Sequence, residues 1–389
     1  MKILSVVGAR PNFMKIAPFS HAISKWNNSH PLKEIEHILL HTGQHYDDSL
    51  SQSFFQQLNI PMPDIKLGIG SGTHAEQVGK TMIAFEKVIH SHKPDWVVVV
   101  GDVNATLACS ITAKKEHIKV CHIEAGLRSR DMAMPEEINR VVTDRLSDLL
   151  LTPDKFASKN LLEEGISKNH IVLVGNIMVD TLEANLKKAS QLDSLSILKK
   201  NLLSDNIPSN FPEEYGLMTM HRPSNVDEKK ILYSIIHSLI DNISSKLPII
   251  WPIHPRTLKQ LKKFGLWEQV KEKQNIYFLE PVSYHEMLHL NLNARIMFTD
   301  SGGLQEECCI LGTPCLTLRW NTERPITLKD LGGVSLLVGN DIKIIETEFE
   351  KMITNNYETP SYRPKLWDGQ TAVRCLRAIM RYDEIELNN

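Results

Sequence analysis

Short runs of aliphatic and β-branched residues alternate with longer segments of helical periodicity along nearly the whole chain. Runs such as Lys2–Val7, Val97–Val100 and Lys119–Ile123 are short and rich in β-branched residues, and they do not alternate regularly with polar positions. That pattern is typical of strands buried on both faces of a parallel sheet. Because such strands alternate with helices, the pattern predicts a doubly wound α/β fold.

The expected elements form two successive series. Strands of the first series are expected at Lys2–Val7, Glu36–His41, Val97–Val100, Lys119–Ile123, Leu149–Thr152 and Ile171–Val174. Its helices are expected near Phe13–Trp26 (after a turn at Gly8–Pro11), Asp48–Phe55, Thr73–Ser91, Asn104–Glu116, from Pro135 onward, and up to about Glu164. The second series is expected to have a helix at Val179–Leu203, a loop at Ser204–Glu214, a last helix near Gly369–Tyr382, and strands at Leu217–Met220, Pro248–Ile253, Ile276–Leu279, Arg295–Thr299, Pro314–Thr317 and Val334–Val338.

The length and composition bound the class of protein. A chain of 389 residues is too long for one small core, so we expect two similar α/β units that face one another with the active site between them. A net charge of −2 gives no general attraction to nucleic acid or to an anionic membrane. No apolar run approaches the ~20 residues of a membrane span. The six cysteines lie in apolar surroundings without Cys-x-x-Cys spacing, which predicts reduced core residues of a cytoplasmic protein and no structural zinc site.

Three carboxylates are expected where neighbouring elements begin or end. Asp102 and Glu124 each follow a predicted buried strand, and Pro135 fits the first helical position, which places Glu136 in the first turn. The carboxyl edge of a parallel α/β sheet is where ligands bind, so these acids predict proton chemistry in a cleft. For the adjacent Glu137 we favour a helix-capping role instead.

Two glycine motifs fail on spacing. Gly79-Lys80-Thr81 looks like the end of a P-loop, but His74 occupies the position of the required earlier glycine. Gly68–Gly72 is not Gly-x-Gly-x-x-Gly and follows no convincing strand. The sequence therefore does not favour ATP hydrolysis or a tightly held NAD.

The strongest anion site is Thr299–Glu307, where a strand ends and a helix begins at once with two glycines. The free amides and the positive dipole end of that helix would bind a phosphate or a diphosphate, and a simple tight turn is the alternative for two glycines at a helix start. Glu307, one turn later, is placed to accept hydrogen bonds from ribose hydroxyls. With Arg324 near a following strand-to-helix turn, a nucleoside diphosphate is the expected ligand.

Further candidate ligand residues follow other predicted strands. Arg10 and Lys15 bracket the first strand-to-helix connection; Arg10 can bind phosphate or carboxylate oxygens in a fork, and a solvated surface lysine is the alternative for Lys15. His221 and His254 each end a strand of the second series beside an arginine. Of the two histidines, His221 is the stronger candidate.

These segments together resemble the non-hydrolysing UDP-N-acetylglucosamine 2-epimerase family. The matching stretches are Gly8–Lys15, Gln44-His45, Gly101–Ala108, His122–Arg128, Pro135–Arg140, His221-Arg222, Thr299–Glu307 and Thr322–Pro325. The resemblance implies two Rossmann-like domains of the glycosyltransferase-B type: residues 1–172 joined by a C-terminal helix at 366–389, and a UDP-binding domain at 173–365. It also implies a homodimer.

The family reaction inverts C2 of the sugar while UDP leaves C1 and is then added back, without metal or redox cofactor. The resemblance makes Asp102, Glu124 and Glu136 the candidate acid/base groups, with Asp102 favoured as the base. It places Arg10, Lys15 and His221 around the sugar and the diphosphate, and it assigns UDP binding to Ser301, Gly302, Gly303, Glu307 and Arg324. The expected substrate is UDP-N-acetylglucosamine and the expected role is the supply of a surface-polysaccharide precursor.

Two departures from the family pattern leave the exact activity open. Many bacterial members bind a second substrate molecule as an activator through a Gln-His-Arg loop, whereas this chain has Gln44-His45-Tyr46-Asp47, whose acid would repel a diphosphate. The short loop before Pro135 occurs in variants that act on relatives such as UDP-2,3-diacetamido-glucuronate. A glycosyltransferase on the same scaffold and a nucleotide-sugar sensor are two further functions that such a chain could have.

Overall fold

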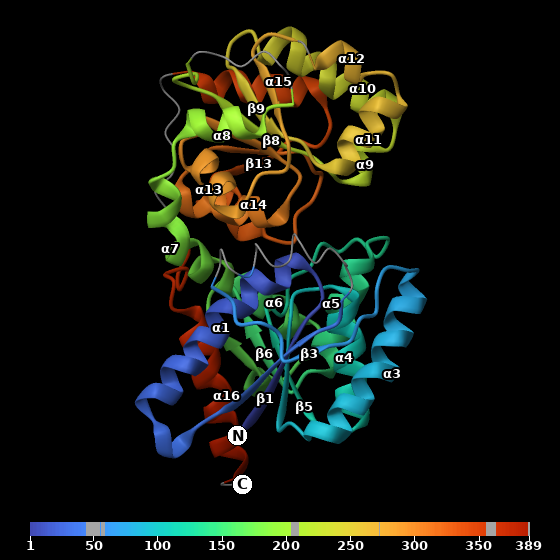
Figure 1. Ribbon diagram of the computed structural model, residues 1–389, viewed down its shortest axis with the longest axis vertical. Helices are drawn as coiled ribbons and strands as arrows, with labels where there is room; N and C mark the ends of the chain where they lie inside the picture. The colour runs from blue at the N-terminus through green and yellow to red at the C-terminus, as the bar shows by residue number, and fades with distance from the viewer. Residues whose placement is uncertain (44–54, 56–58, 204–209, 272, 355–362, 388–389) are drawn as a thin grey trace. The chain divides into compact units, whose positions relative to one another are not determined.

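The computed structural model describes residues 1–43, 55, 59–203, 210–271, 273–354 and 363–387 (Figure 1). The chain divides into two α/β units, one formed by residues 1–183 and 365–389 and the other by residues 184–364. The division falls within α7 (Ile177–Ser190). Contacts of α7 explain why the first unit extends to residue 183: Asp180 accepts hydrogen bonds from the backbone amides of Thr371 and Ala372, and the Thr181 hydroxyl donates to the Met14 carbonyl.

The described residues of the first unit form one parallel sheet in the order β3-β2-β1-β4-β5-β6-β7. Its strands are β1 (Lys2–Val7), β2 (Glu36–His41), β3 (Ile65–Lys66), β4 (Trp96–Val100), β5 (Lys119–Ile123), β6 (Leu149–Thr152) and β7 (Ile171–Leu173). Every residue of β4 is buried, which is why the run of valines does not alternate with polar side chains.

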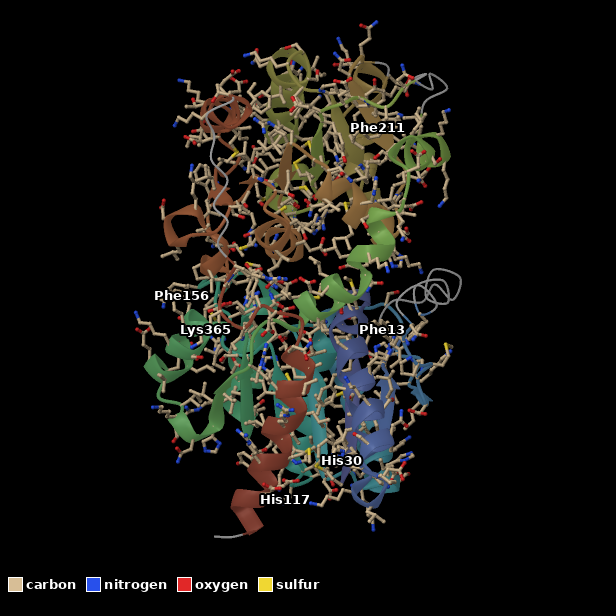
Figure 2. The ribbon with its side chains drawn as sticks, turned by 90° about the vertical axis from the view of Figure 1, so that its left-hand side faces the viewer. Phe13, His30, His117, Phe156, Phe211 and Lys365 are labelled. Carbon is tan, nitrogen blue, oxygen red and sulfur yellow. The ribbon has the colours of Figure 1, made fainter. Side chains whose placement is uncertain are left out.

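Helices cover both faces of this sheet. They are α1 (Arg10–Ser29), α3 (His74–His92), α4 (Asn104–Lys115), α5 (Pro135–Leu146), α6 (Lys155–Glu163), α7 and α16 (Thr371–Leu387), with 3-10 turns at Pro31–Lys33 and Lys168–His170. α3, α4 and α5 pack in a row (Figure 1). The C-terminal α16 lies beside α1, whose course is marked by the labels Phe13 and His30 in Figure 2.

The second unit repeats the design with a parallel sheet in the order β10-β9-β8-β11-β12-β13 in the described residues. Its strands are β8 (Gly216–Thr219), β9 (Ile249–Pro252), β10 (Ile276–Leu279), β11 (Ile296–Thr299), β12 (Cys315–Thr317) and β13 (Ser335–Leu337). Its helices are α8 (Ser194–Asn201), α9 (Pro223–Val226), α10 (Lys229–Ser238), α11 (Pro255–Lys263), α12 (Trp267–Val270), α13 (Tyr284–Leu292), α14 (Gly302–Leu311) and α15 (Ile342–Ile353), with a π-turn at Leu239–Ile243 and 3-10 turns at Pro325–Thr327 and Lys329–Leu331. α10 packs on α15, and α13 packs on α14 and α8. The prediction of two doubly wound parallel α/β units is confirmed.

Local sequence signals set where several helices begin. Thr73 and Glu76 form a capping box at the start of α3, and Ser283 and Glu286 form another at the start of α13. Asp154 accepts two backbone amides at the start of α6. Each device satisfies amides that the first helical turn leaves without partners.

Two predicted helices were wrong in their bounds. The helix expected from Phe13 begins earlier, at Arg10, so the second half of the turn expected at Gly8–Pro11 is helical. Pro11 is tolerated in a first turn, where its missing N–H is no loss. The single helix expected at Val179–Leu203 is two helices, because Asp193 caps a new one by accepting the Ser196 amide at 2.7 Å. The short β3 was not predicted, and most of the helix expected at Asp48–Phe55 lies outside the described residues.

Both sheets share a topological feature that locates a binding site. The strand order reverses between β1 and β4 in the first unit and between β8 and β11 in the second. Loops at the carboxyl ends of such strand pairs diverge and leave a ligand crevice. Among the described helices, none combines the length and apolar character that crossing a bilayer requires.

Candidate active site

In the first unit, Asn12 joins the ends of the two strands at which the order reverses. Its side-chain oxygen accepts the amides of Gly8 and Ala9 after β1, at 3.3 and 3.0 Å, and its Nδ2 donates to the Val100 carbonyl at the end of β4 at 2.8 Å. Gly101 follows with φ of +69°, and a Cβ there would lie 3.1 Å from Lys15 Nζ. The absence of a side chain at Gly101 therefore lets the Lys15 ammonium approach the backbone after β4.

Lys15 and Glu124 form a buried ion pair at this site. Lys15 Nζ lies 2.8 Å from Oε1 and 2.7 Å from Oε2 of Glu124, and the two side chains are 8% and 3% exposed. Glu124 directly follows β5 and has φ of +73°, a left-handed conformation that costs a residue with a Cβ about 1–3 kcal/mol. The alternative of a solvated surface lysine at position 15 is thus wrong, and the Lys15 ammonium instead contacts a candidate catalytic carboxylate.

Asp102 follows β4 and is partly open to solvent, with a side chain that is 26% exposed. Its Oδ2 lies 3.1 Å from Nε of Arg140 on α5, and its backbone carbonyl accepts Nδ2 of Asn139 at 2.8 Å. The two acids at adjacent strand ends are therefore held by different cations, Asp102 by Arg140 and Glu124 by Lys15. Sequence reasoning gave Arg140 no role, although it lies within the matching Pro135–Arg140 stretch.

The two acids of the first turn of α5 differ in environment. Glu137 is buried and accepts the backbone amides of Ser129 at 2.9 Å and Arg130 at 2.8 Å, so it holds the preceding loop rather than capping its own helix. Glu136 is exposed. Because residues four apart share one face of a helix, Glu136 lies on the face of α5 from which Arg140 reaches Asp102. Glu136 stays a predicted acid/base group.

Three buried side chains, His122, Asp144 and Arg128, form a hydrogen-bond network next to the ends of β4 and β5. His122 on β5 has Nε2 2.9 Å from the Gly101 carbonyl and Nδ1 2.6 Å from Asp144 Oδ1. Asp144 Oδ2 also accepts Arg128 Nη1 at 2.7 Å. Burial raises the pKa of Asp144, but the charges and hydrogen bonds of His122 and Arg128 outweigh it and hold that pKa below its usual value. Sequence reasoning gave these contacts no role, although His122 and Arg128 are the first and last residues of the matching His122–Arg128 stretch; Asp144 lies outside it.

In the second unit, the predicted anion site is a helix start at the point where the strand order reverses. β11 ends at Thr299, and α14 begins at Gly302. Ser301 makes no side-chain hydrogen bond to the first turn, so that turn is not capped from within. A Cβ on Gly302 would meet Arg324 Nη1 at 2.5 Å, whereas a Cβ on Gly303 would meet nothing within 4 Å. The absence of a side chain at Gly302 thus lets the Arg324 guanidinium pack against the helix start, and the position next to Gly303 is open.

Arg324 is brought to the start of α14, but two carboxylates already bind it. Its Nε lies 2.7 Å from Glu306 Oε1, and its Nη1 donates to Glu323. The second oxygen of Glu323 accepts Arg319 Nη2 at 2.7 Å. All these side chains are buried. The structure thus places Arg324 where it was expected, while its contact with UDP stays a prediction.

Glu307, the predicted ribose acceptor, is buried in α14 beside a second acid. Burial, and then the charge of Glu306, raise the pKa of Glu307 to about 8, against a smaller opposing effect of Asn291. Its Oε2 has no hydrogen-bond partner among the described residues. Contact of Glu307 with a ribose hydroxyl stays a prediction.

His221 follows β8 and is held by Asp300, which follows β11. His221 Nδ1 lies 3.0 Å from Asp300 Oδ1, and the His221 side chain is 40% exposed. His254, the weaker candidate, uses its Nδ1 to accept the Arg256 amide at the start of α11, so its role in the structure is that of a cap. The Arg10 side chain and the loop Gln44–Asp47 lie outside the described residues.

Comparison with known proteins identifies the family. The chain matches the model of the UDP-N-acetylglucosamine 2-epimerase family over residues 28–380. It is 43% identical over 381 residues to the UDP-N-acetylglucosamine 2-epimerase of Methanocaldococcus jannaschii, covering 97% of this chain and 99% of that protein. It is 38% identical over 325 residues to the UDP-2,3-diacetamido-2,3-dideoxy-D-glucuronate 2-epimerase of Pseudomonas aeruginosa, covering 83% and 84% of the two.

The structural comparison agrees. The crystal structure of the Methanocaldococcus jannaschii UDP-GlcNAc 2-epimerase in complex with UDP-GlcNAc and UDP matches with a TM-score of 0.84 and 41% identity, covering 98% of this chain and 100% of that one. The resemblance drawn from short motifs is therefore confirmed by matches that span both units. The chain belongs to the UDP-N-acetylglucosamine 2-epimerase family.

Proposed function

We propose that this protein is a non-hydrolysing UDP-N-acetylglucosamine 2-epimerase that interconverts UDP-GlcNAc and UDP-ManNAc. The observation that carries the proposal is the 43% identity, over nearly the full length of both chains, to an enzyme of that name. The local geometry supports it. In the first unit, two carboxylates that form ion pairs lie at the ends of adjacent strands. In the second unit, α14 begins without a side-chain cap, which suits the binding of a diphosphate.

The proposed reaction is an elimination followed by an addition. A carboxylate of the first unit removes the proton on C2, and the C–H electron pair forms the C1–C2 double bond. The C1–O bond breaks, and its electron pair leaves with UDP. UDP then adds back to C1 while a proton returns to the opposite face of C2. Because one proton leaves from one face of C2 and another arrives at the opposite face, two acid/base groups are required. We propose that they are two of the three residues Asp102, Glu124 and Glu136.

The proposed roles of the acids follow from their surroundings. Asp102 is the more accessible of the two strand-end carboxylates and is proposed as the base. Such a group supplies roughly 10²–10⁴-fold in rate. Much of the rest must come from stabilising the departing diphosphate, which we assign to the amides of Ser301, Gly302 and Gly303 and to cationic side chains. Arg10, Lys15, His221, Glu307 and Arg324 complete the proposed set of substrate contacts.

Incubation with UDP-GlcNAc in heavy water tests the proposal. Proton NMR should show loss of the C2–H signal from both UDP-GlcNAc and newly formed UDP-ManNAc. Asp102→Asn and Glu124→Gln should abolish this exchange, whereas Glu163→Gln, which changes an exposed acid of the same unit, should not. Recovery of unlabelled UDP-GlcNAc alone would refute the proposal, and release of free ManNAc would indicate a hydrolysing enzyme. Because no acceptor is added, turnover also distinguishes an epimerase from a glycosyltransferase.

A second candidate substrate is UDP-2,3-diacetamido-2,3-dideoxyglucuronate, which the relative from Pseudomonas aeruginosa supports. The same assay with this sugar decides between the two, since the preferred substrate will have the higher kcat/KM. We further propose that the enzyme works as a homodimer, to be checked by light scattering. We also propose that it acts in the cytoplasm on a surface-polysaccharide precursor; all six cysteines are buried and free, as in a reducing compartment.

A further inference from the structure

Asp300 is a buried carboxylate for which the proposed reaction has so far given no role. It is fully buried and accepts four different donors: the backbone amides of His221 and Arg222, Nδ2 of Asn225, and the Nδ1 side of the His221 ring. The distances lie between 2.8 and 3.1 Å. Burial raises the pKa of Asp300, but hydrogen bonds from His221 and from the two amides outweigh it and hold that pKa below its usual value.

The sheet register brings these two residues together although 79 positions separate them in the chain. β8 and β11 are parallel neighbours, with Thr219 opposite Thr299. The residues that leave the two strand ends therefore emerge side by side, His221 after β8 and Asp300 after β11. This strand pair is also the point where the order of the second sheet reverses.

The contact determines which ring nitrogen of His221 is available. An ionised carboxylate only accepts hydrogen bonds, so Nδ1 must carry the proton that is shared with Asp300. Nε2 is then the nitrogen left for a ligand, and the 40% exposed side chain leaves it accessible. A second proton on Nε2 makes an imidazolium whose charge Asp300 balances. His254, with its ring centroid 5.1 Å from that of His221, does not compete for Asp300, because its Nδ1 caps α11.

Asp300 also belongs to the predicted anion site. It directly precedes Ser301, and its carbonyl accepts Arg222 Nε at 2.9 Å. Asn225, which donates to Asp300, donates as well to the Leu318 carbonyl at 2.9 Å. Asp300, which contacts the His221 ring, is therefore joined through the main chain to the start of α14. The position of the His221 ring relative to the start of α14 is fixed by this connection.

We propose that Asp300 is a positioning residue that keeps His221 protonated on Nδ1 and directs its Nε2–H to a phosphate oxygen of UDP bound at the start of α14. The inference rests on the proposed function, since it assigns His221 to the UDP that leaves C1. The Nε2–H hydrogen bond would strengthen as negative charge collects on the departing diphosphate, which is how a preorganised donor lowers a barrier.

Asp300→Asn tests this role. The amide has nearly the same shape, but an acceptor must remain for the backbone amides of His221 and Arg222, which turns the Asn NH₂ group toward His221 Nδ1. The ring is then expected to switch to the Nε2–H tautomer without an imidazolium. In a chain labelled with ¹⁵N-histidine, the ring nitrogen shifts should report an Nδ1 proton in the wild type and its loss in Asp300→Asn. A wild-type His221 without a proton on Nδ1 would overturn the inference even if the variant failed to fold.

Kinetics in heavy water supply the second measurement. Asp300→Asn should lower kcat by about 10²-fold, because the variant ring keeps its Nε2–H but loses the positive charge that would face the departing diphosphate. In a His221→Asn background the same change should cost about twofold or less, because residues that act through one another are not additive. Equal losses in both backgrounds would overturn the inference. Asp341→Asn is the matched control: Asp341 also accepts backbone amides in this unit but contacts no histidine in the described residues, and kcat should be unchanged.

Failure of the proposed function can be distinguished from failure of this inference. If the wild type turns over neither UDP-sugar, the function is wrong, and the tautomer measurement still reports on Asp300. If the wild type is active but Asp300→Asn matches its kcat while remaining folded by circular dichroism, only the inference is wrong.

Discussion

The buried pair of Lys15 and Glu124 offers the sharpest stability test of the first unit. Both side chains are less than a tenth exposed, and the ammonium lies within 2.8 Å of both carboxylate oxygens. Lys15→Met keeps the length of the side chain but removes the charge, so the buried Glu124 carboxylate loses its ion pair with Lys15. Removing one partner of a buried ion pair costs about 3–5 kcal/mol, because the remaining charge stays away from water after it has lost that partner.

The companion change, Glu124→Gln, should cost less than Lys15→Met, since an amide oxygen can still accept from Nζ. The double variant carries neither charge, so its loss of unfolding free energy should be smaller than the sum of the two single losses by about 0.5–3 kcal/mol. Urea unfolding followed by circular dichroism measures all four corners of this cycle.

Lys159→Met provides the control for removal of a lysine charge in the same unit. Its ion pair with Glu163 is 70% and 52% exposed, and such pairs contribute about 0–1 kcal/mol. If Lys15→Met cost no more than this control, or if the cycle closed without coupling, the pair would not be buried in solution and the reasoning would be refuted.

Three further outcomes are expected. The pKa of Glu307, about 8, lies above the ~4.3 of an unfolded chain, so stability should fall as pH rises between these values; urea midpoints should lose this slope in Glu307→Gln. Asp144→Asn should cost about 1–3 kcal/mol in urea unfolding, because Arg128 loses its buried partner and keeps its pair with the 40% exposed Glu164; a loss under about 1 kcal/mol would contradict the network. Gly302→Ala should lower the melting temperature, since its Cβ would lie 2.5 Å from an arginine nitrogen; Gly303→Ala, with nothing within 4 Å, should not, and equal effects would count against this packing.

Most strands could be predicted from the sequence because burial on both faces leaves an unmistakable apolar run. Lys2–Val7, Glu36–His41 and Ile276–Leu279 have the predicted bounds. Helix boundaries were harder, since they depend on single hydrogen bonds: the cap by Asp193 divides one predicted helix into two. The two-residue β3 is too short to leave a pattern at all.

The residues of the candidate site likewise fall into those that the sequence indicates and those that it does not. Asp102, Glu124 and His221 could be selected because each follows a buried strand, and the carboxyl edge of a parallel sheet is a known place for ligands. The charged partners of these three side chains could not be selected from the sequence. Arg140 reaches Asp102 from another helix, and Asp300 reaches His221 from the neighbouring strand. No local pattern encodes a contact between residues that the strand order alone brings together.

What the sequence by itself determined is the alternation of elements, the family, and which polar residues stand at strand ends, because each of these depends on neighbours in the chain. Only the tertiary structure decided the charge partners: Lys15 with Glu124, Arg128 with Asp144, and Arg324 with Glu306. The physical reason is that a buried charge must be paired, and the packing of distant segments selects its partner.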